Sequence, residues 1–188
     1  MGRWEPDARG RLEKAALELY SERGFEQTTV AEIAKRARLT ERTFFRHYAD
    51  KREVLFSGAG LLEALLVRAL TETPETTAPI AAVATALQAA AELMQQRREQ
   101  AMQRQAVITA NAELRERELI KMASLAGALA QALRGRGVGE PMASLAAETG
   151  TAVFRIAFER WVNPANKRTL AWLMSDTFDD LKAIAADG

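Results

Sequence analysis

The apolar positions of the first quarter of the chain have the spacing of short amphipathic helices. One predicted helix covers residues 8–23, because its apolar side chains recur three and four residues apart and Gly24 follows as a stop signal. A second begins after Thr29, where Thr-Val-Ala-Glu has the form of a capping box. A third covers residues 41–48 behind a cap at Thr40. The pattern predicts two short helices that meet at a turn.

A fourth helix is predicted to follow these three closely. Its start is the capping pattern Asp-Lys-Arg-Glu at residues 50–53, and its apolar positions continue through Leu70. The segment TETPETTAP at residues 71–79 then ends it.

The rest of the chain also carries helical patterns and no strand-like alternation. Residues 80–133 are rich in alanine, leucine and glutamine, which favours two or three helices, with a helix cap at Asn111. A glycine-rich loop at 135–141 precedes two final helices, predicted at 141–161 and 165–186. The sequence therefore predicts an all-α fold.

The composition narrows the possible chemistry. Of 188 residues, 48% are hydrophobic and 27% are charged, which is typical of a globular protein. The chain has no cysteine and one histidine, so it offers no thiolate site and no paired metal ligands. We expect no metal, no cofactor and no catalysis. A charged N-terminus and the absence of an apolar run of membrane length predict a cytoplasmic protein without membrane contact.

Positive charge is concentrated around the third predicted helix, although the net charge of the chain is only +1. Residues 35–52 hold seven basic side chains against two acidic ones. On a helical wheel, Phe44 and Tyr48 fall on the side that faces the core. The opposite arc holds Arg42, Thr43, Arg46 and His47, with Phe45 at its edge. Arginine reads guanine edges and a helix fits the major groove, so this arc is predicted to be the reading surface of a helix-turn-helix.

Further side chains near the predicted helix starts suit DNA phosphates. Helix N-termini attract anions, and Thr29, Thr40 and Lys51 lie at or near such ends. The imidazole of His47 is predicted to donate to a phosphate through a ring N–H.

The stretch FEQTTVAEIAKRARLTERTFFRHYADKREVLF resembles the DNA-binding domain of the tetracycline-repressor (TetR) family of one-component bacterial regulators, from about Leu12 to Phe56. The resemblance implies a three-helix DNA-binding domain at residues 1–56 and a larger helical effector-binding and dimerisation domain at 57–188. It implies DNA contacts, mainly to phosphates, from Thr29, Thr43, Phe45, His47 and Lys51, with Arg42 and Arg46 setting the operator sequence. Arg38 departs from the pattern, because the family often has glycine in this turn; a left-handed conformation there would carry strain.

The same resemblance implies that the last two helices pair with their counterparts in a second copy. The residues expected at this dimer interface are Val153, Trp161, Leu170, Leu173, Phe178 and Leu181. The alternative is that such residues close the core of the chain itself.

The middle of the chain is similar, more weakly, to a subfamily described as binding acyl-CoA-like ligands, of the mycofactocin-regulator type, mainly through NAELRERE at 111–118. Apolar side chains would line an acyl site and arginines would meet an anionic group. The predicted ligand-binding residues are Met94, Met102, Arg104, Asn111, Arg115, Met122, Phe154, Arg155 and Phe158. The alternative is that they are core residues and surface ion pairs.

These patterns predict a homodimeric transcriptional regulator, expected to be a repressor, that binds a pseudo-palindromic operator through residues 40–51 and is released by a small apolar or acyl-type effector. One alternative is a non-specific architectural DNA-binding protein, which would favour a larger positive charge than +1. Another is a helical-bundle enzyme, for which the sequence offers no pair of like metal ligands.

Overall fold

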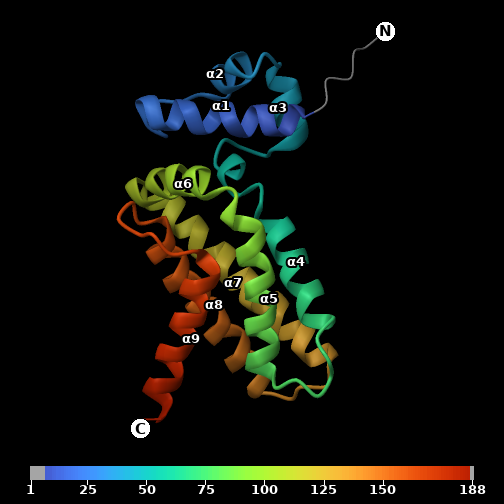
Figure 1. Cartoon of the computed structure of the whole chain (residues 1–188). Helices are drawn as coiled ribbons and strands as arrows, with labels where there is room; N and C mark the ends of the chain where they lie inside the picture. Colours follow the sequence, from blue (N-terminus) through green and yellow to red (C-terminus); the bar gives the residue numbers. More distant parts are fainter. Residues whose placement is uncertain (1–6, 187–188) are drawn as a thin grey trace. The chain divides into compact units, whose positions relative to one another are not determined.

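A computed structural model describes residues 7–186 of the chain, and every regular element in that range is helical (Figure 1). The elements are α1 (Ala8–Arg23), α2 (Val30–Arg36), α3 (Glu41–His47), the 3₁₀-helix η1 (Glu53–Phe56), α4 (Ala59–Thr71), α5 (Pro79–Gln95), α6 (Arg98–Ala110), α7 (Ala112–Gly135), α8 (Met142–Val162) and α9 (Leu170–Ala186). The all-α prediction is confirmed.

The chain forms two compact units, and the first is not continuous in sequence. It contains the residues up to Gly58 together with Gln103–Glu118, whereas the second contains Ala59–Met102 and the chain from Leu119 onward. The sequence-based division between residues 56 and 57 had assigned 103–118 to the larger domain. The physical reason is burial: Val107, Ile108 and Leu114 lie in the same core as the apolar side chains of α1, α2 and α3.

The predicted fourth helix is interrupted. Asp50 Oδ1 accepts from the backbone N–H groups of Arg52 and Glu53, at 2.8 and 3.1 Å, but the element that follows is the 3₁₀-helix η1 rather than a long α-helix. Three successive residues of η1, Val54–Phe56, are all buried in the first core. Because one stripe of an α-helix cannot bury three successive side chains, the helix ends there and α4 starts separately at Ala59.

The last helix starts later than predicted, at Leu170 instead of Ala165. The intervening turn is stabilised by side chains that bind its own backbone: Asn163 Oδ1 accepts from Ala165 N at 2.9 Å, and Asn166 Oδ1 accepts from Arg168 N at 3.0 Å. Such asparagine turns compete with helix formation.

For residues 80–133 two or three helices were predicted, and the structure has three, α5, α6 and α7. Asn111 lies between α6 and α7, but its side-chain amide donates to Val107 O at 2.7 Å, so it closes the end of α6.

The core of the second unit is built mainly from α5 and α8, to which α4, α7 and α9 add buried side chains, with Trp161 fully buried. The alanines of α5 allow close helix packing. At the α5–α8 contact Gly150 is required, because a Cβ added there would lie 2.2 Å from Val83 Cγ1.

One stretch in the described chain, Glu53–Thr71, is long and apolar enough to cross a membrane by length and composition alone, with a mean hydropathy of 1.6. None was expected from the sequence. Of this stretch 28% is buried, and Leu66 and Leu70 are fully buried in the second core.

Candidate functional site

Helix α3 has one buried side and one exposed side, as predicted. Phe44 is fully buried and packs on Tyr48, with ring centroids 5.5 Å apart. The Tyr48 hydroxyl donates to Glu13 Oε1 at 2.9 Å, which ties the end of α3 to α1. Burial, with a contribution from the nearby Glu13 carboxylate, raises the pKa of Tyr48 well above its ordinary value, so the hydroxyl stays protonated as a donor. These contacts fix the rotation of α3 about its axis.

The opposite side of α3 carries the predicted reading residues. Arg42, Phe45, Arg46 and His47 are exposed, and Phe45 has 55% of its surface accessible. Thr43 is half-buried and shares a hydroxyl contact of 3.0 Å with Thr40 Oγ1, which also accepts from Thr43 N as the helix cap. The structure therefore brings these predicted residues onto one helical face.

The capping box at the start of α2 is also present. Thr29 Oγ1 accepts from Glu32 N at 3.3 Å, and Glu32 Oε2 accepts from Thr29 N at 2.9 Å. The two Thr29 hydrogen bonds, with the Arg23 guanidinium, hold the pKa of Glu32 below its ordinary value. Thr29 is exposed at the start of this helix.

The turn between α2 and α3 contains the expected left-handed residue. Arg38 has φ 55°, and Leu39 N donates to Ala34 O at 2.8 Å across the turn. A side chain at positive φ costs about 1–2 kcal/mol relative to the right-handed region.

Replacing Arg38 by glycine is expected to stabilise the protein by about 0.5–1 kcal/mol, because glycine removes this strain but adds unfolded-state entropy. The measurement is the free energy of unfolding in urea. Arg38→Ala is the matched control, since it removes the charge and keeps the Cβ. Equal stability of the two variants would contradict the strain argument.

Part of the predicted basic stretch is neutralised by carboxylates, most of which are distant in sequence. Arg36 pairs with Glu18 and with Glu22, at 3.3 and 2.8 Å, and Arg52 pairs with Asp50 and Glu113. Within the basic stretch at residues 35–52, the exposed cations that form no ion pair with a carboxylate of residues 7–186 are Lys35, Arg38, Arg42 and Arg46. The unpaired positive charge of this stretch thus lies on α2, α3 and their turn.

Lys51 does not present a free ammonium group. Its Nζ donates to the backbone carbonyls of Phe25, Glu26 and Thr28, at 2.9, 3.3 and 3.0 Å. The resemblance had implied a phosphate contact for this residue.

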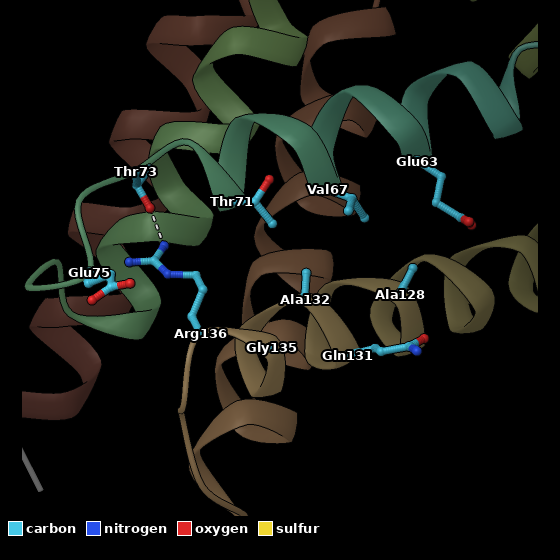
Figure 2. Close-up of a pocket in the computed structure, with 10 residues that line it drawn as sticks. All are labelled: Glu63, Val67, Thr71, Thr73, Glu75, Ala128, Gln131, Ala132, Gly135 and Arg136. Atoms are coloured by element: carbon cyan, nitrogen blue, oxygen red, sulfur yellow. Dashed lines mark hydrogen bonds between the residues drawn. The ribbon is translucent and has the colours of Figure 1, made fainter.

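The second unit contains a cleft of about 560 Å³ between α4 and α7 (Figure 2). Its apolar walls are Val67 on α4 and Ala128 and Ala132 on α7, which point toward one another. At one end Arg136 donates to Leu70 O at 2.8 Å and to the Thr73 hydroxyl, so its guanidinium ties the end of α7 to the end of α4. The other lining residues are Glu63, Thr71, Glu75, Gln131 and Gly135.

The nine residues predicted to bind a ligand are not among those that line this cleft. Arg104, Asn111 and Arg115 belong to the first unit, where the Arg104 Nε donates to Leu55 O at 2.6 Å and its guanidinium pairs with Glu118 at 3.3 Å. In the second unit, Phe154 is buried, Met94, Met122 and Phe158 pack against the core, Met102 is half-buried, and Arg155 pairs with Glu159 on the surface. No sequence signal marks the cleft, because its walls are small residues in ordinary helical positions.

The residues predicted for the dimer interface mostly serve the core of the chain itself. Val153, Trp161, Leu170, Leu173 and Phe178 are buried in the second core, and Leu181 packs against it. This placement corresponds to the alternative interpretation. The large apolar side chains that α8 and α9 leave exposed are Met142, Leu145, Ile156, Trp172 and Ile184.

Comparison with known proteins agrees with this geometry. Residues 12–57 match the family model for bacterial regulatory proteins of the tetR family. The chain is 37% identical over 81 residues to the HTH-type transcriptional regulator TcmR of Streptomyces glaucescens. Residues 12–57 are therefore similar to the DNA-binding part of tetR-family regulators. The TcmR match covers 43% of this chain and 36% of TcmR, so it spans about a third of that relative.

Solved structures of tetR-family proteins share the fold over nearly the whole chain. FadR of Thermus thermophilus, a repressor solved in complex with lauroyl-CoA, is 25% identical with a TM-score of 0.57, and the match covers 91% of each chain. A regulator from Syntrophomonas wolfei is 15% identical with a TM-score of 0.68, and the match covers 96% of this chain and 95% of that one.

Proposed function

We propose that this tetR-family chain is a transcriptional repressor that binds a pseudo-palindromic DNA operator as a homodimer and is released by a small effector. The observation that carries the proposal is the exposed face of α3, where Arg42, Arg46 and His47 stand free of carboxylate partners while Phe44 and Tyr48 hold the helix in place. Such a face suits the major groove. A regulator of this kind acts on DNA in the cytoplasm.

The homodimer follows from the size of the reading surface. A single helix-turn-helix reads one half-site, so a symmetric pair is needed for a palindromic operator. The exposed apolar side chains of α8 and α9 offer a surface for this pairing. Leu145, Ile156, Trp172 and Ile184 each have between 41% and 73% of their surface accessible.

The cleft between α4 and α7 is the proposed effector site. Its volume lies in the range of about 300–1,000 Å³ that small-molecule sites occupy. Its apolar walls suit an acyl chain, a class supported by the likeness to the lauroyl-CoA-bound FadR. An effector that binds better to the conformation with low DNA affinity would shift the population toward it and release the operator.

The first experiment is selection from a random double-stranded DNA pool at near-physiological salt. An enriched inverted repeat supports the dimeric sequence reader and supplies an operator for further work. Salt-labile binding without enrichment would favour a non-specific architectural protein instead. Absence of binding would contradict the proposal.

Filling the cleft is expected to weaken effector binding. Ala128→Phe places an aromatic ring between Val67 and Ala132. The lauroyl-CoA concentration needed for thermal stabilisation of the protein, and that needed for release of the operator, are both expected to rise about tenfold. Ala123→Phe, on the exposed surface of the same helix, is the matched control. Equal responses of both variants would place the effector elsewhere.

A further inference from the structure

The cleft between α4 and α7 carries more negative than positive charge. Its lining includes two carboxylates, those of Glu63 and Glu75, and one guanidinium, that of Arg136. The Arg136 Nη1 donates to Leu70 O at 2.8 Å, and its Nη2 donates to Pro74 O at 2.7 Å. Both terminal nitrogens of this guanidinium therefore bind the end of α4 and the loop that follows it.

The charges are unevenly distributed along the cleft. Figure 2 shows Glu75 beside Arg136 at one end and Glu63 at the other, with Val67 between them. Glu63 and Thr71 both line the cleft and lie about 12 Å apart along α4, since an α-helix rises about 1.5 Å per residue. Arg136 offsets the charge of Glu75 at its own end, so the opposite end keeps the negative charge of Glu63.

The Glu63 carboxylate has no counter-ion in the described part of the chain. It forms no ion pair with a basic side chain of residues 7–186, although Glu63 is half-buried. Arg68, the basic residue of the same helix, is paired instead with Glu72 at 2.8 Å. A carboxylate that is partly removed from water without a counter-ion is unfavourable. This end of the cleft therefore favours a ligand with a positive charge.

The groups near Glu63 suit an ammonium group that carries N–H donors. Gln131 on α7 lies at the same end of the cleft, and its side-chain carbonyl is a hydrogen-bond acceptor (Figure 2). The residues that line this cleft include no aromatic side chain. Quaternary ammonium groups lack N–H donors and are typically recognised by aromatic rings. A primary ammonium group therefore fits this end better than a quaternary one.

We propose that the effector of this cleft is a primary alkylammonium compound, whose ammonium group binds Glu63 and whose chain lies along Val67, Ala128 and Ala132. The inference rests on the proposed effector role of the cleft and names the head group. It keeps the apolar chain of an acyl-type effector. It replaces the negative head group of an acyl-CoA by a positive one, because Arg136, the cation that lines the cleft, is bound to the cleft wall.

Three compounds with the same dodecyl chain test the head group. Dodecylammonium, dodecanol and dodecanoate differ mainly in charge, and their binding to the protein without DNA is measured by calorimetry at neutral pH, below micelle-forming concentrations. Dodecylammonium is expected to bind about tenfold more tightly than dodecanol, the gain that a hydrogen bond to a charged group corresponds to, and dodecanoate more weakly than either. Equal affinities, tighter binding of dodecanoate, or no binding of any of the three would overturn the proposal.

Variants of Glu63 assign the preference to this carboxylate. Glu63→Gln keeps the size of the side chain and removes its charge, so it is expected to abolish the preference for dodecylammonium while dodecanol affinity stays the same. Glu63→Lys is expected to reverse the preference in favour of dodecanoate. A preference that survives in Glu63→Gln would contradict the assignment.

Glu92→Gln is the matched control, because Glu92 is an exposed carboxylate on α5 that does not line the cleft. It is expected to keep the wild-type preference for dodecylammonium. A loss equal to that of Glu63→Gln would show that the net charge of the protein attracts the cation, and would overturn the role of Glu63.

Release of the operator separates this inference from the proposed function. Dodecylammonium is expected to release the operator at about a tenfold lower concentration than lauroyl-CoA, and Glu63→Gln is expected to lose that advantage, which excludes a direct effect of the amine on DNA. Release by lauroyl-CoA at the lower concentration would overturn the ammonium assignment and leave the repressor function standing. If the protein binds no operator, the repressor function fails, whereas calorimetry still decides which head group the cleft binds.

Discussion

Replacing Arg42 and Arg46 together by alanine is expected to reduce operator affinity about hundredfold or more. Each side chain is exposed on the reading face of α3 and forms no ion pair with a carboxylate in the described part of the chain. A bidentate arginine–guanine contact discriminates by about 1–3 kcal/mol, so two such contacts account for a loss of this size. Affinity for unrelated DNA is expected to fall much less.

The measurement is competition of labelled operator with unlabelled variants at each base pair. The single variants Arg42→Ala and Arg46→Ala are each expected to lose discrimination at specific base pairs of the operator, as for an arginine that reads a base. Lys35→Ala is the control, because Lys35 is an exposed, unpaired cation on α2 rather than α3. Uniform weakening across all positions would assign the two arginines to phosphate contacts.

Gly150→Ala, which adds a single methyl group, is expected to destabilise the second unit by about 1–3 kcal/mol. The new Cβ would lie 2.2 Å from Val83 Cγ1, which is well inside van der Waals contact. Valine is branched at Cβ and has one strongly preferred rotamer in a helix, so it cannot easily turn away. Helices α5 and α8 would have to move apart.

Double-mutant analysis of thermal or urea unfolding tests this clash. Val83→Ala removes the opposing methyl groups, so Gly150→Ala is expected to cost much less in that background. Gly127→Ala on α7 is the control, since a Cβ there meets nothing within 4 Å and the change is expected to stabilise the helix by up to about 1 kcal/mol. A destabilisation by Gly150→Ala that is independent of residue 83 would contradict the explanation.

The features that could be predicted from the sequence are those specified within a few residues. The cap of α2 is one, because the side chain of Thr29 accepts from the backbone N–H of Glu32 and the side chain of Glu32 accepts from that of Thr29, only three residues apart. The inward side of α3 is another, because helical spacing alone places Phe44 and Tyr48 together. The exposed face of α3 follows directly from this geometry.

The features that the sequence analysis missed depend on contacts between distant segments. The pairing of Arg52 with Glu113 and the carbonyl cluster around Lys51 have no local signature, since any exposed lysine or arginine has the same appearance in a sequence. Apolar residues on α8 and α9 could equally face the core or a partner. Only packing distinguishes Val153, which is buried, from Ile156, which is exposed.

The discontinuous first unit limits how this fold can be recombined with others. A chimaera joined at residue 58 would lack Val107, Ile108 and Leu114, and their absence would create a cavity in the core that supports α3. A replacement sensor domain would have to supply side chains of matching shape at those three positions. Transplanting Gln103–Glu118 together with the N-terminal residues keeps that core whole, so a modular exchange needs two grafted segments instead of one.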